Sequence, residues 1–317
     1  MDNYLGTLQD ALVSGEKIYN SRTGKYCHSL IGLQLSYDMN DGFPLVTTRK
    51  VPFKSIVGEL LGFFRGYTNA KDFRDLGCKF WDQNANETKA WLENPFRLGT
   101  DDLGRIYGAQ WTSWKAPNII ADTVEKYTYL SKLGYTVMAE DNGMPVMTKF
   151  INQLEEALKT ILTNPSDRRI IVTGWNPGEM PFQALPACHM DYRFVPIETK
   201  KVMHVVMTIR SWDLFLGAPA NIASTALFLH IMCKLSGYTP GTVTIQATNA
   251  HIYEDHIEQV SEQIRRDPLP LPTINLDAIK ECKSVDDVSG AFSSITPDQV
   301  VLENYYHREP LHGVMSA

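Results

Sequence analysis

Apolar residues recur at helical spacing in four parts of the chain, and each recurrence predicts a helix. The expected helices cover residues 5–18, 53–64, 150–162 and 221–237. The third is stopped by Asn164-Pro165 and the last is capped by Gly237. The second carries one carboxylate, Glu59, among its apolar residues.

Short apolar runs between turn residues predict strands at 30–37, 170–175, 190–195, 202–210 and 243–246. Residues 115–148 are more polar and less periodic, and Asp141-Asn-Gly143 predicts a hairpin turn within them. We interpret this stretch as a peripheral insertion on a single domain that spans residues 1–317. Helices mixed with successive strands favour an α+β domain around a mostly antiparallel or mixed sheet.

The amino-acid composition limits which kinds of molecule the protein is expected to bind. The net charge of -6 over 317 residues gives no general attraction to DNA or to an anionic membrane, so an anionic ligand needs a local cationic cluster. The chain has no apolar stretch long enough to span a membrane, and Met1-Asp-Asn-Tyr4 lacks the features of a signal peptide, so we expect a cytoplasmic protein. The five cysteines are scattered without C-x-x-C spacing, and we expect no metal.

Cys188 is the candidate nucleophile. It lies in Pro186-Ala-Cys-His189, 22 residues before Arg210. A thiolate is the strongest side-chain nucleophile near neutral pH, and an arginine folded against it would lower its pKa. Glu59 lies either at the rim of its helix or in a polar cavity, where desolvation would raise its pKa toward proton transfer.

Four arginines, Arg22, Arg168, Arg169 and Arg210, suit a phosphate dianion. Stretches 80–86 and 102–111 mix aromatic rings with amides, as in pockets for flat heterocycles or in an ordinary aromatic core. Together these features predict an enzyme that acts on a nucleotide base. Its sulfur would attack C6 of the base, and a one-carbon unit from a folate-like donor would then be added at C5. A thiol protease with His251 as base and Asn221 as orienting amide is the alternative, but it leaves the arginines unexplained.

In their order along the chain, these segments resemble the thymidylate synthase family over essentially the whole sequence. The resemblance implies an α+β domain whose large twisted mixed sheet packs against its twin in a homodimer. The segments that carry it are Arg22-Thr-Gly24, Asp41-Gly-Phe-Pro-Leu-Val-Thr-Thr48, Gly58-Glu-Leu-Leu61, Trp81-Asp82, Leu103-Gly-Arg-Ile-Tyr-Gly-Ala-Gln-Trp111, Asp167-Arg-Arg169, Pro186-Ala-Cys-His189, Arg210-Ser211, Asn221-Ile-Ala223 and Ala250-His-Ile-Tyr253.

The resemblance also implies a role for each site residue. Cys188 would add to C6 of dUMP, Glu59 would order a water and proton network, and Tyr107 would help to remove the C5 proton. Asn221 would read the uracil edge. The remaining substrate contacts would be Arg22, Arg210 and Ser211 with the phosphate, Arg168 and Arg169 reaching that phosphate from the partner subunit, His251 and Tyr253 with the 3′-hydroxyl, and His189 in the surrounding network. The contacts with 5,10-methylenetetrahydrofolate would be Asp213, which also faces the substrate, with Phe80, Trp81, Gly217 and Ala317.

Several positions depart from the family pattern, mostly on the folate side. Gly62, Tyr67 and Ala220 stand where the family usually has tryptophan, aspartate and phenylalanine, Asn249 replaces an aspartate and Trp212 a small residue. The ending Gly313-Val-Met-Ser-Ala317 also differs from the usual Pro-(Val/Met)-Ala-Val. We expect these changes to loosen or reshape the folate side.

Two products are therefore open. Hydride transfer to the C5 methylene gives dTMP and dihydrofolate, the thymidylate synthase reaction, which we predict. Capture by water gives 5-hydroxymethyl-dUMP and tetrahydrofolate, the reaction of a dUMP hydroxymethylase. An RNA-binding protein with a decayed site is a third possibility, which the retained Cys188, Arg210, Asn221 and Tyr107 argue against.

Overall fold

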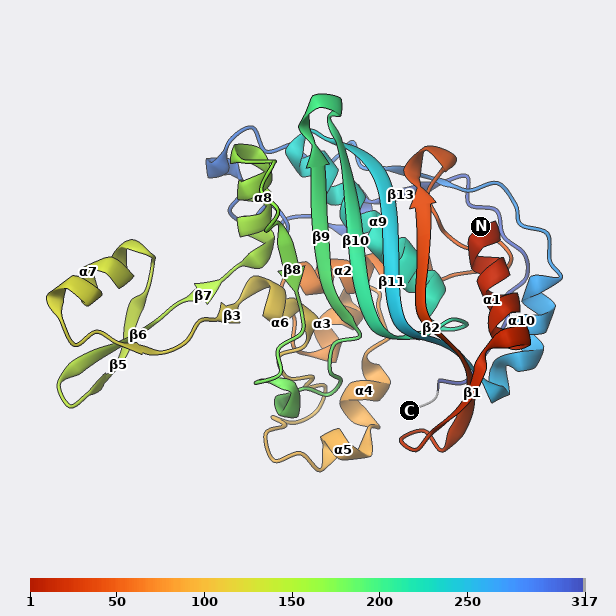
Figure 1. The fold of residues 1–317 in the computed structure, drawn as a ribbon, viewed down its shortest axis with the longest axis horizontal. Helices are drawn as coiled ribbons and strands as arrows, with labels where there is room; N and C mark the ends of the chain where they lie inside the picture. Colours follow the sequence, from red (N-terminus) through yellow and green to blue (C-terminus); the bar gives the residue numbers. More distant parts are fainter. Residues whose placement is uncertain (316–317) are drawn as a thin grey trace.

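A six-stranded mixed sheet forms the centre of the structure, a computed structural model that describes residues 1–315 (Figure 1). Neighbouring strands follow the order β1-β2-β11-β10-β9-β8, in which β10 and β11 pair parallel and the other neighbours pair antiparallel. The mixed sheet of a single α+β domain, predicted from the sequence, is confirmed. The strands are β1 (Glu16–Asn20), β2 (Lys25–Asp38), β8 (Ile171–Thr173), β9 (His189–Ile197), β10 (Val202–Asp213) and β11 (Thr239–Tyr253).

Helices cover one face of this sheet. The central one, α9 (Gly217–Ser236), is buried along most of its length because it lies against β10 and β11 while α2 (Phe53–Phe64) and α8 (Gln153–Thr163) pack on its other sides. Its Phe228 is fully buried. That ring lies with its centroid 5.0–5.6 Å from the rings of Phe64, Trp111, Tyr192 and Phe194. This aromatic cluster joins the helical layer to the sheet.

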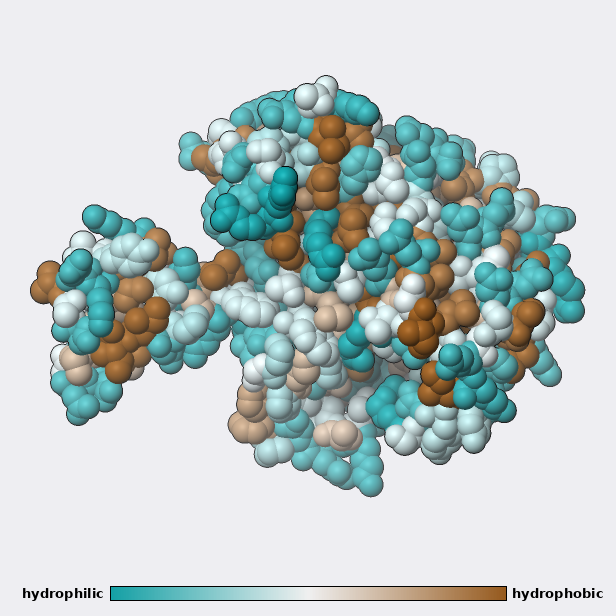
Figure 2. All heavy atoms as spheres, in the orientation of Figure 1, coloured by the Kyte–Doolittle hydropathy of each residue, from teal (hydrophilic) through white to brown (hydrophobic). Residues whose placement is uncertain are grey.

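The opposite face of the sheet carries no helix (Figure 1). Along β10, the buried side chains from Met203 to Ile209 alternate with partly exposed ones from Val202 to Thr208, as the period of two in a strand requires. Exposed apolar side chains on this face include Ile171 of β8 (41% exposed), next to the buried Val172, and Val195 of β9 (44%), next to the buried Phe194. In Figure 2 brown apolar atoms are interspersed with polar ones over this face. One face of the sheet is thus left without a partner within the chain.

The first helix is shorter than the sequence pattern predicts. α1 covers Asp2–Ser14, and the residues expected to continue it to position 18 form β1 instead. Gly15 is extended (φ -64°, ψ 136°), and a Cβ there would lie 2.3 Å from the carbonyl oxygen of Ala11. The expected extension is wrong because pairing with β2 outweighs the apolar spacing contributed by Ile18 alone.

Residues 114–151 form a lobe that stands away from the main body (Figure 1). Its own small core consists of Ala121, Leu130 and Met147. Asn142 and Gly143 both have positive φ (48° and 74°), the turn conformation that joins the β5–β6 hairpin, so the predicted hairpin turn is confirmed. The lobe contains β3 (Trp114–Lys115), β4 (Ile119–Ile120), α7 (Val124–Lys132), β5 (Thr136–Asp141), β6 (Met144–Thr148) and β7 (Phe150–Ile151).

The C-terminal part of the chain returns across the body. The Arg308 backbone N–H donates to the Thr47 carbonyl (2.8 Å), and the Tyr305 hydroxyl donates to the Val46 carbonyl (2.8 Å). No helix within residues 1–315 has the length and apolarity needed to cross a bilayer. The remaining elements are α3 (Ala70–Asp75), α4 (Asp82–Asn86), α5 (Lys89–Leu92), α6 (Tyr107–Thr112), α10 (Ile257–Ile264), β12 (Thr273–Asn275), β13 (Val301–Glu303) and short 3₁₀ turns.

Phe228→Ala should lower the free energy of unfolding by about 3–5 kcal/mol, because it leaves a cavity where four rings meet. Urea denaturation followed by circular dichroism measures the change. Leu98→Ala is the matched control, since Leu98 is 90% exposed and its truncation should change stability by about 0.5 kcal/mol or less. Equal effects of the two substitutions would contradict the central position of Phe228.

Candidate active site

Cys188 lies in a loop that ends where β9 begins, and Arg210 of β10 holds that loop. The Arg210 side chain donates to two carbonyls, from Nε to Ala187 (2.9 Å) and from Nη2 to Pro186 (3.0 Å). Its backbone N–H donates to the Cys188 carbonyl (3.0 Å). The guanidinium also lies over the ring of Trp175, 5.6 Å from its centroid. Arg210 therefore folds against the loop that carries the cysteine.

Tyr107, the first residue of α6, contacts the same loop. Its hydroxyl oxygen accepts the Cys188 backbone N–H at 2.6 Å, and its ring stacks on Phe63 with centroids 5.0 Å apart. Burial raises the pKa of Tyr107 well above its usual value, with a smaller contribution from Cys188. The phenol is therefore neutral and keeps its proton, so it can take part in proton relays beside the cysteine.

Glu59 extends this cluster from α2. The indole Nε1 of Trp81 donates to Glu59 Oε1 (3.0 Å), and the Trp81 ring lies edge-on to Tyr107 with centroids 5.8 Å apart. Burial raises the pKa of Glu59 to about 7, while the hydrogen bond from Trp81 opposes that rise. A carboxyl group that titrates near neutral pH can both accept and donate a proton. Glu59 is half-buried and adds a carboxyl group to the cluster formed by Trp81 and Tyr107.

The first turn of α9 brings Asn221 and Gly217 together. A Cβ on Gly217 would lie 3.3 Å from Asn221 Oδ1, so glycine leaves room for the carboxamide. His189 is buried, its Nδ1 lies 3.0 Å from the Tyr192 hydroxyl, and burial lowers its pKa to about 4, partly offset by a hydrogen bond with Asn221. His189 is therefore neutral at physiological pH, which suits a network residue.

Asp213 ends β10 and turns the chain into α9. Its Oδ1 accepts the backbone N–H groups of Phe215 and Leu216, each at 2.9 Å. Within residues 1–315 its Oδ2 accepts no hydrogen bond, so one oxygen is committed to the turn and the other remains available to a donor such as a pterin N–H. This is the fit that the expected folate contact requires.

The residues expected at the sugar and phosphate lie on neighbouring strands. Ser211 and Asp213 of β10 pair in register with Asn249 and His251 of β11. The His251 and Tyr253 rings are perpendicular, 5.0 Å apart. Burial lowers the pKa of His251 and raises that of Tyr253. Arg22 is exposed in the turn between β1 and β2, and its charge acts to lower both pKa values, so it lies near both residues.

The thiol protease alternative required Asn221 to orient His251. His251 Nδ1 instead lies 3.0 Å from Asn249 Oδ1, so a different amide orients the imidazole. The protease arrangement is therefore not formed.

Arg168 and Arg169 do not reach Cys188 within one chain. They precede β8 at the edge of the sheet, where Ile171 pairs with Arg193, five residues along β9 from the cysteine and thus about 17 Å away. Both are exposed, and Arg169 binds Asp167 through Nε (2.9 Å) and Nη2 (2.7 Å), which lowers the pKa of Asp167 to about 2.

The expected folate contacts are placed only in part. Phe80 is half-buried beside the buried Trp81. The C-terminal segment approaches from the other side, since His256 Nε2 lies 2.9 Å from the Val314 carbonyl, and a Cβ on Gly313 would lie 2.7 Å from the Phe215 ring. The expected contact of Ala317 lies outside the described residues.

The departure at Gly62 does not leave a void. A Cβ on Gly62 would lie 2.4 Å from the Phe73 ring, and Tyr67 lies edge-on to that ring with centroids 5.8 Å apart. Phe73 and Tyr67 fill the space in which a larger residue at position 62 would sit. Of the two expected effects of the departures, loosening or reshaping, the space beside Gly62 is reshaped, because the Phe73 ring occupies it.

Sequence reasoning missed several residues that hold the site. Trp175 lies against Arg210 and Tyr192 against His189, while Asn249 orients His251. In the sequence, Trp175 is an aromatic residue at the end of one predicted strand, and Tyr192 is an aromatic residue within the next. Asn249 is an amide two positions before a histidine. All are common in ordinary cores, so they did not single out a site.

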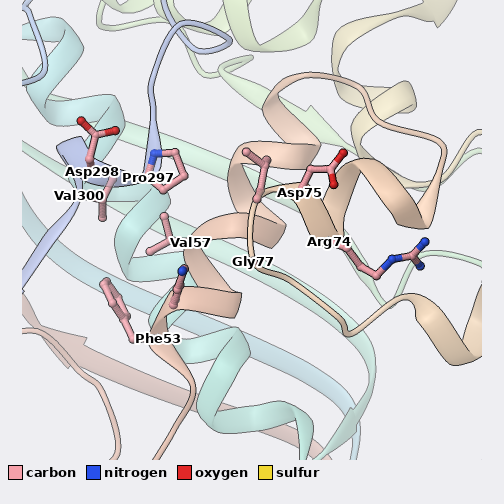
Figure 3. Close-up of a pocket in the computed structure, with 10 residues that line it drawn as sticks. Phe53, Val57, Arg74, Asp75, Gly77, Pro297, Asp298 and Val300 are labelled. Carbon is pink, nitrogen blue, oxygen red and sulfur yellow. The ribbon is translucent and has the colours of Figure 1, made fainter.

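A separate cavity of about 630 Å³ lies between α2 and the C-terminal segment (Figure 3). Phe53 and Val57 of α2 line it together with Gly77, Pro297 and Val300. Val57 and Glu59 are about 200° apart around the helix at 100° per residue, so the cavity faces away from Glu59. We do not include it in the candidate site. Among residues 1–315, no cluster of three His, Cys, Asp or Glu side chains suits a metal ion.

Glu59 should titrate near pH 7, and thus be mostly neutral below that pH, because burial disfavours its charged form. ¹³C NMR of labelled glutamate, assigned with Glu59→Gln, measures the midpoint. Trp81→Phe should raise it further by removing a hydrogen bond that stabilises the carboxylate. Glu262, whose pKa is lowered by Arg266 and Arg265, is the internal control. A Glu59 midpoint near 4.5 would contradict the buried assignment.

The chain is similar to known proteins over nearly its whole length. A family model described as thymidylate synthase matches residues 2–317. The chain is 39% identical to the thymidylate synthase of Pseudomonas putida and 39% identical to that of Bordetella parapertussis, in both cases over the full length of both chains. It is 37% identical to the thymidylate synthase of Vibrio parahaemolyticus over 98% of each chain. The chain therefore belongs to the thymidylate synthase family.

Proposed function

We propose that the protein transfers a one-carbon unit from 5,10-methylenetetrahydrofolate to C5 of dUMP and releases dTMP and dihydrofolate. Membership of the family implies folate-dependent methyl transfer to C5 of dUMP. The single observation that carries the proposal for this chain is the binding of Arg210 to the loop of Cys188, which supplies an electropositive setting for a thiolate.

The sulfur of Cys188 attacks C6 of the uracil, and the electron pair of the C5–C6 bond moves toward O4. C5 then becomes nucleophilic and forms a bond to the one-carbon unit, for which the folate supplies the methylene carbon and later a hydride. Loss of the C5 proton into the Tyr107 and Glu59 relay breaks the bond between the methylene carbon and the folate nitrogen, which leaves an exocyclic methylene at C5 while the sulfur stays on C6. The hydride supplied by tetrahydrofolate adds to this methylene, and the C5–C6 double bond re-forms as the Cys188 sulfur leaves, giving dTMP and dihydrofolate. The near-neutral titration of Glu59 supports this role, since the group must accept and return protons.

Nucleotide recognition follows from the neighbouring strands. Asn221 donates to O4 and accepts from N3–H of the uracil, which selects against cytosine. His251 and Tyr253 hold the 3′-hydroxyl. The phosphate is bound by Arg22, Arg210 and Ser211, whose charges and hydroxyl suit a dianion. On the folate side, Asp213 holds the pterin through its unengaged Oδ2, next to Trp81 and Phe80.

We propose a homodimer formed through the uncovered face of the sheet. That face bears exposed apolar side chains such as Ile171 and Val195, which monomeric proteins seldom leave in one region. Arg168 and Arg169 are exposed and far from Cys188 of their own chain. In a two-fold dimer they complete the phosphate site of the partner subunit.

Hydride transfer rather than water capture is the proposed second half of the reaction. The relatives reported above are named thymidylate synthase, and no observation specifically favours the hydroxymethylase. Phe73 and Tyr67 close the space beside Gly62, which supports exclusion of water from the folate side.

Cys188→Ala should lower kcat by more than about 1,000-fold, because no other group can form the bond to C6. The assay mixes the protein with dUMP and methylenetetrahydrofolate, follows dihydrofolate by absorbance and identifies the nucleotide by mass. Cys282→Ala, at a buried cysteine elsewhere in the fold, is the control and should keep its activity. Full turnover by Cys188→Ala would reject the mechanism, and a product of 5-hydroxymethyl-dUMP mass would reject hydride transfer.

Arg168→Ala combined with Arg169→Ala should raise KM for dUMP, and mixing this variant with Cys188→Ala should restore activity. In a mixed dimer one site has both the cysteine and the partner's arginines, so random 1:1 mixing should recover about a quarter of wild-type activity. Each variant alone is the control. If mixtures in which subunit exchange is verified stay inactive, the arginines do not act across the dimer.

A further inference from the structure

Asn249 and His251 are two positions apart on β11, so their side chains lie on the same face of the strand. Asn249 Oδ1 lies 3.0 Å from His251 Nδ1. Asn249 also pairs in register with Ser211, and His251 with Asp213. The amide therefore lies at the centre of the proposed nucleotide-binding strands, although no role in recognition has been given to it above.

A carboxamide oxygen can only accept a hydrogen bond, so Nδ1 of His251 must carry the proton. In a neutral imidazole the other nitrogen, Nε2, then has a lone pair and no proton. Nε2 can therefore accept a hydrogen bond from a ligand hydroxyl but cannot donate one. The orientation of one amide thus decides which kind of group His251 can recognise.

The charged groups around His251 come from three elements. Its pKa is lowered chiefly by burial, since His251 is only 6% exposed, and also by the charge of Arg22 in the β1–β2 turn. The charge of Asp213 of β10 and a hydrogen bond with Asn249 oppose this and raise the pKa, and Tyr253 of β11 contributes a neutral ring at 5.0 Å. An uncharged amide at position 249 adds no negative charge that would favour the imidazolium form.

We propose that Asn249 is a positioning residue that fixes His251 as a neutral Nε2 acceptor and so restricts the site to nucleotides that offer a hydroxyl donor at the 3′ position. This rests on the proposed binding of dUMP and adds to it the residue that sets specificity at the sugar. A nucleotide whose 3′ group only accepts hydrogen bonds, such as a 3′-ether, places a lone pair of its oxygen against the lone pair of His251 Nε2, so no hydrogen bond forms between them. A carboxylate at position 249 reverses this selection by keeping His251 protonated at both nitrogens.

The tautomer is tested directly by ¹⁵N NMR of histidine-labelled protein, with the His251 signals assigned by their loss in His251→Gln. We expect Nδ1 protonated and Nε2 unprotonated at neutral pH, with and without dUMP. Asn249→Leu should give a mixture of tautomers, and Asn249→Asp should raise the His251 midpoint. Asn142→Asp adds the same charge at the lobe hairpin and should leave His251 unchanged.

Specificity is tested by comparing the dissociation constants of dUMP and its 3′-O-methyl derivative. The preference is the ratio of the dissociation constant of the 3′-O-methyl derivative to that of dUMP. This ratio should fall by about tenfold in Asn249→Asp and stay unchanged in Asn142→Asp. Because the bulk of the methyl group affects every variant alike, comparing the ratios between variants removes its contribution. Any one of three results overturns the proposal. The first is a wild-type His251 with its proton on Nε2, and the second is an Asn249→Leu protein that keeps the wild-type tautomer. The third is an unchanged preference in Asn249→Asp. The NMR result needs no turnover, so it separates this proposal from the proposed function, which the product mass tests.

Discussion

The hydrogen bonds from Arg210 to the carbonyls of Pro186 and Ala187 are the interaction on which the site depends. They fix the loop before Cys188 against β10. The Tyr107 hydroxyl holds the same loop through the Cys188 backbone N–H. Two side chains from distant segments therefore set the position of the proposed nucleophile. One of them, Tyr107, also belongs to the proposed proton relay with Glu59.

The sheet separates two tasks. One face buries its alternate side chains against α9, and the aromatic cluster around Phe228 closes that core. The other face remains uncovered and carries apolar side chains, which supports its use as a contact between subunits. The candidate site lies where the loop before β9, the end of β10 and the start of α9 meet. The core on the helix-covered face thus positions the candidate site. The partner subunit, which we propose to bind the uncovered face, would complete it.

Positions that differ from the family pattern are not equivalent in the structure. Gly62 is compensated by Phe73 and Tyr67, so its effect on the shape of the folate side is small. Asn249 differs in that it contacts a candidate site residue directly, with its Oδ1 3.0 Å from His251 Nδ1. A substitution that only changes volume can be absorbed by neighbours, whereas one that changes hydrogen-bonding capacity cannot.

The sequence by itself determined the mixed α+β fold, the helix Phe53–Phe64 and the set of polar residues that suit a nucleotide and a thiolate, because periodicity and side-chain chemistry are local properties. The prediction from sequence failed where strand pairing outweighed the spacing of apolar residues. At β1, pairing with β2 replaced the predicted end of the first helix. Only the tertiary structure decided that Arg210 binds the Cys188 loop, that Arg168 and Arg169 lie away from it, and that Asn249 rather than Asn221 orients His251. These are contacts between separate strands or choices between similar amides, and strand register and burial set them rather than any single stretch of sequence.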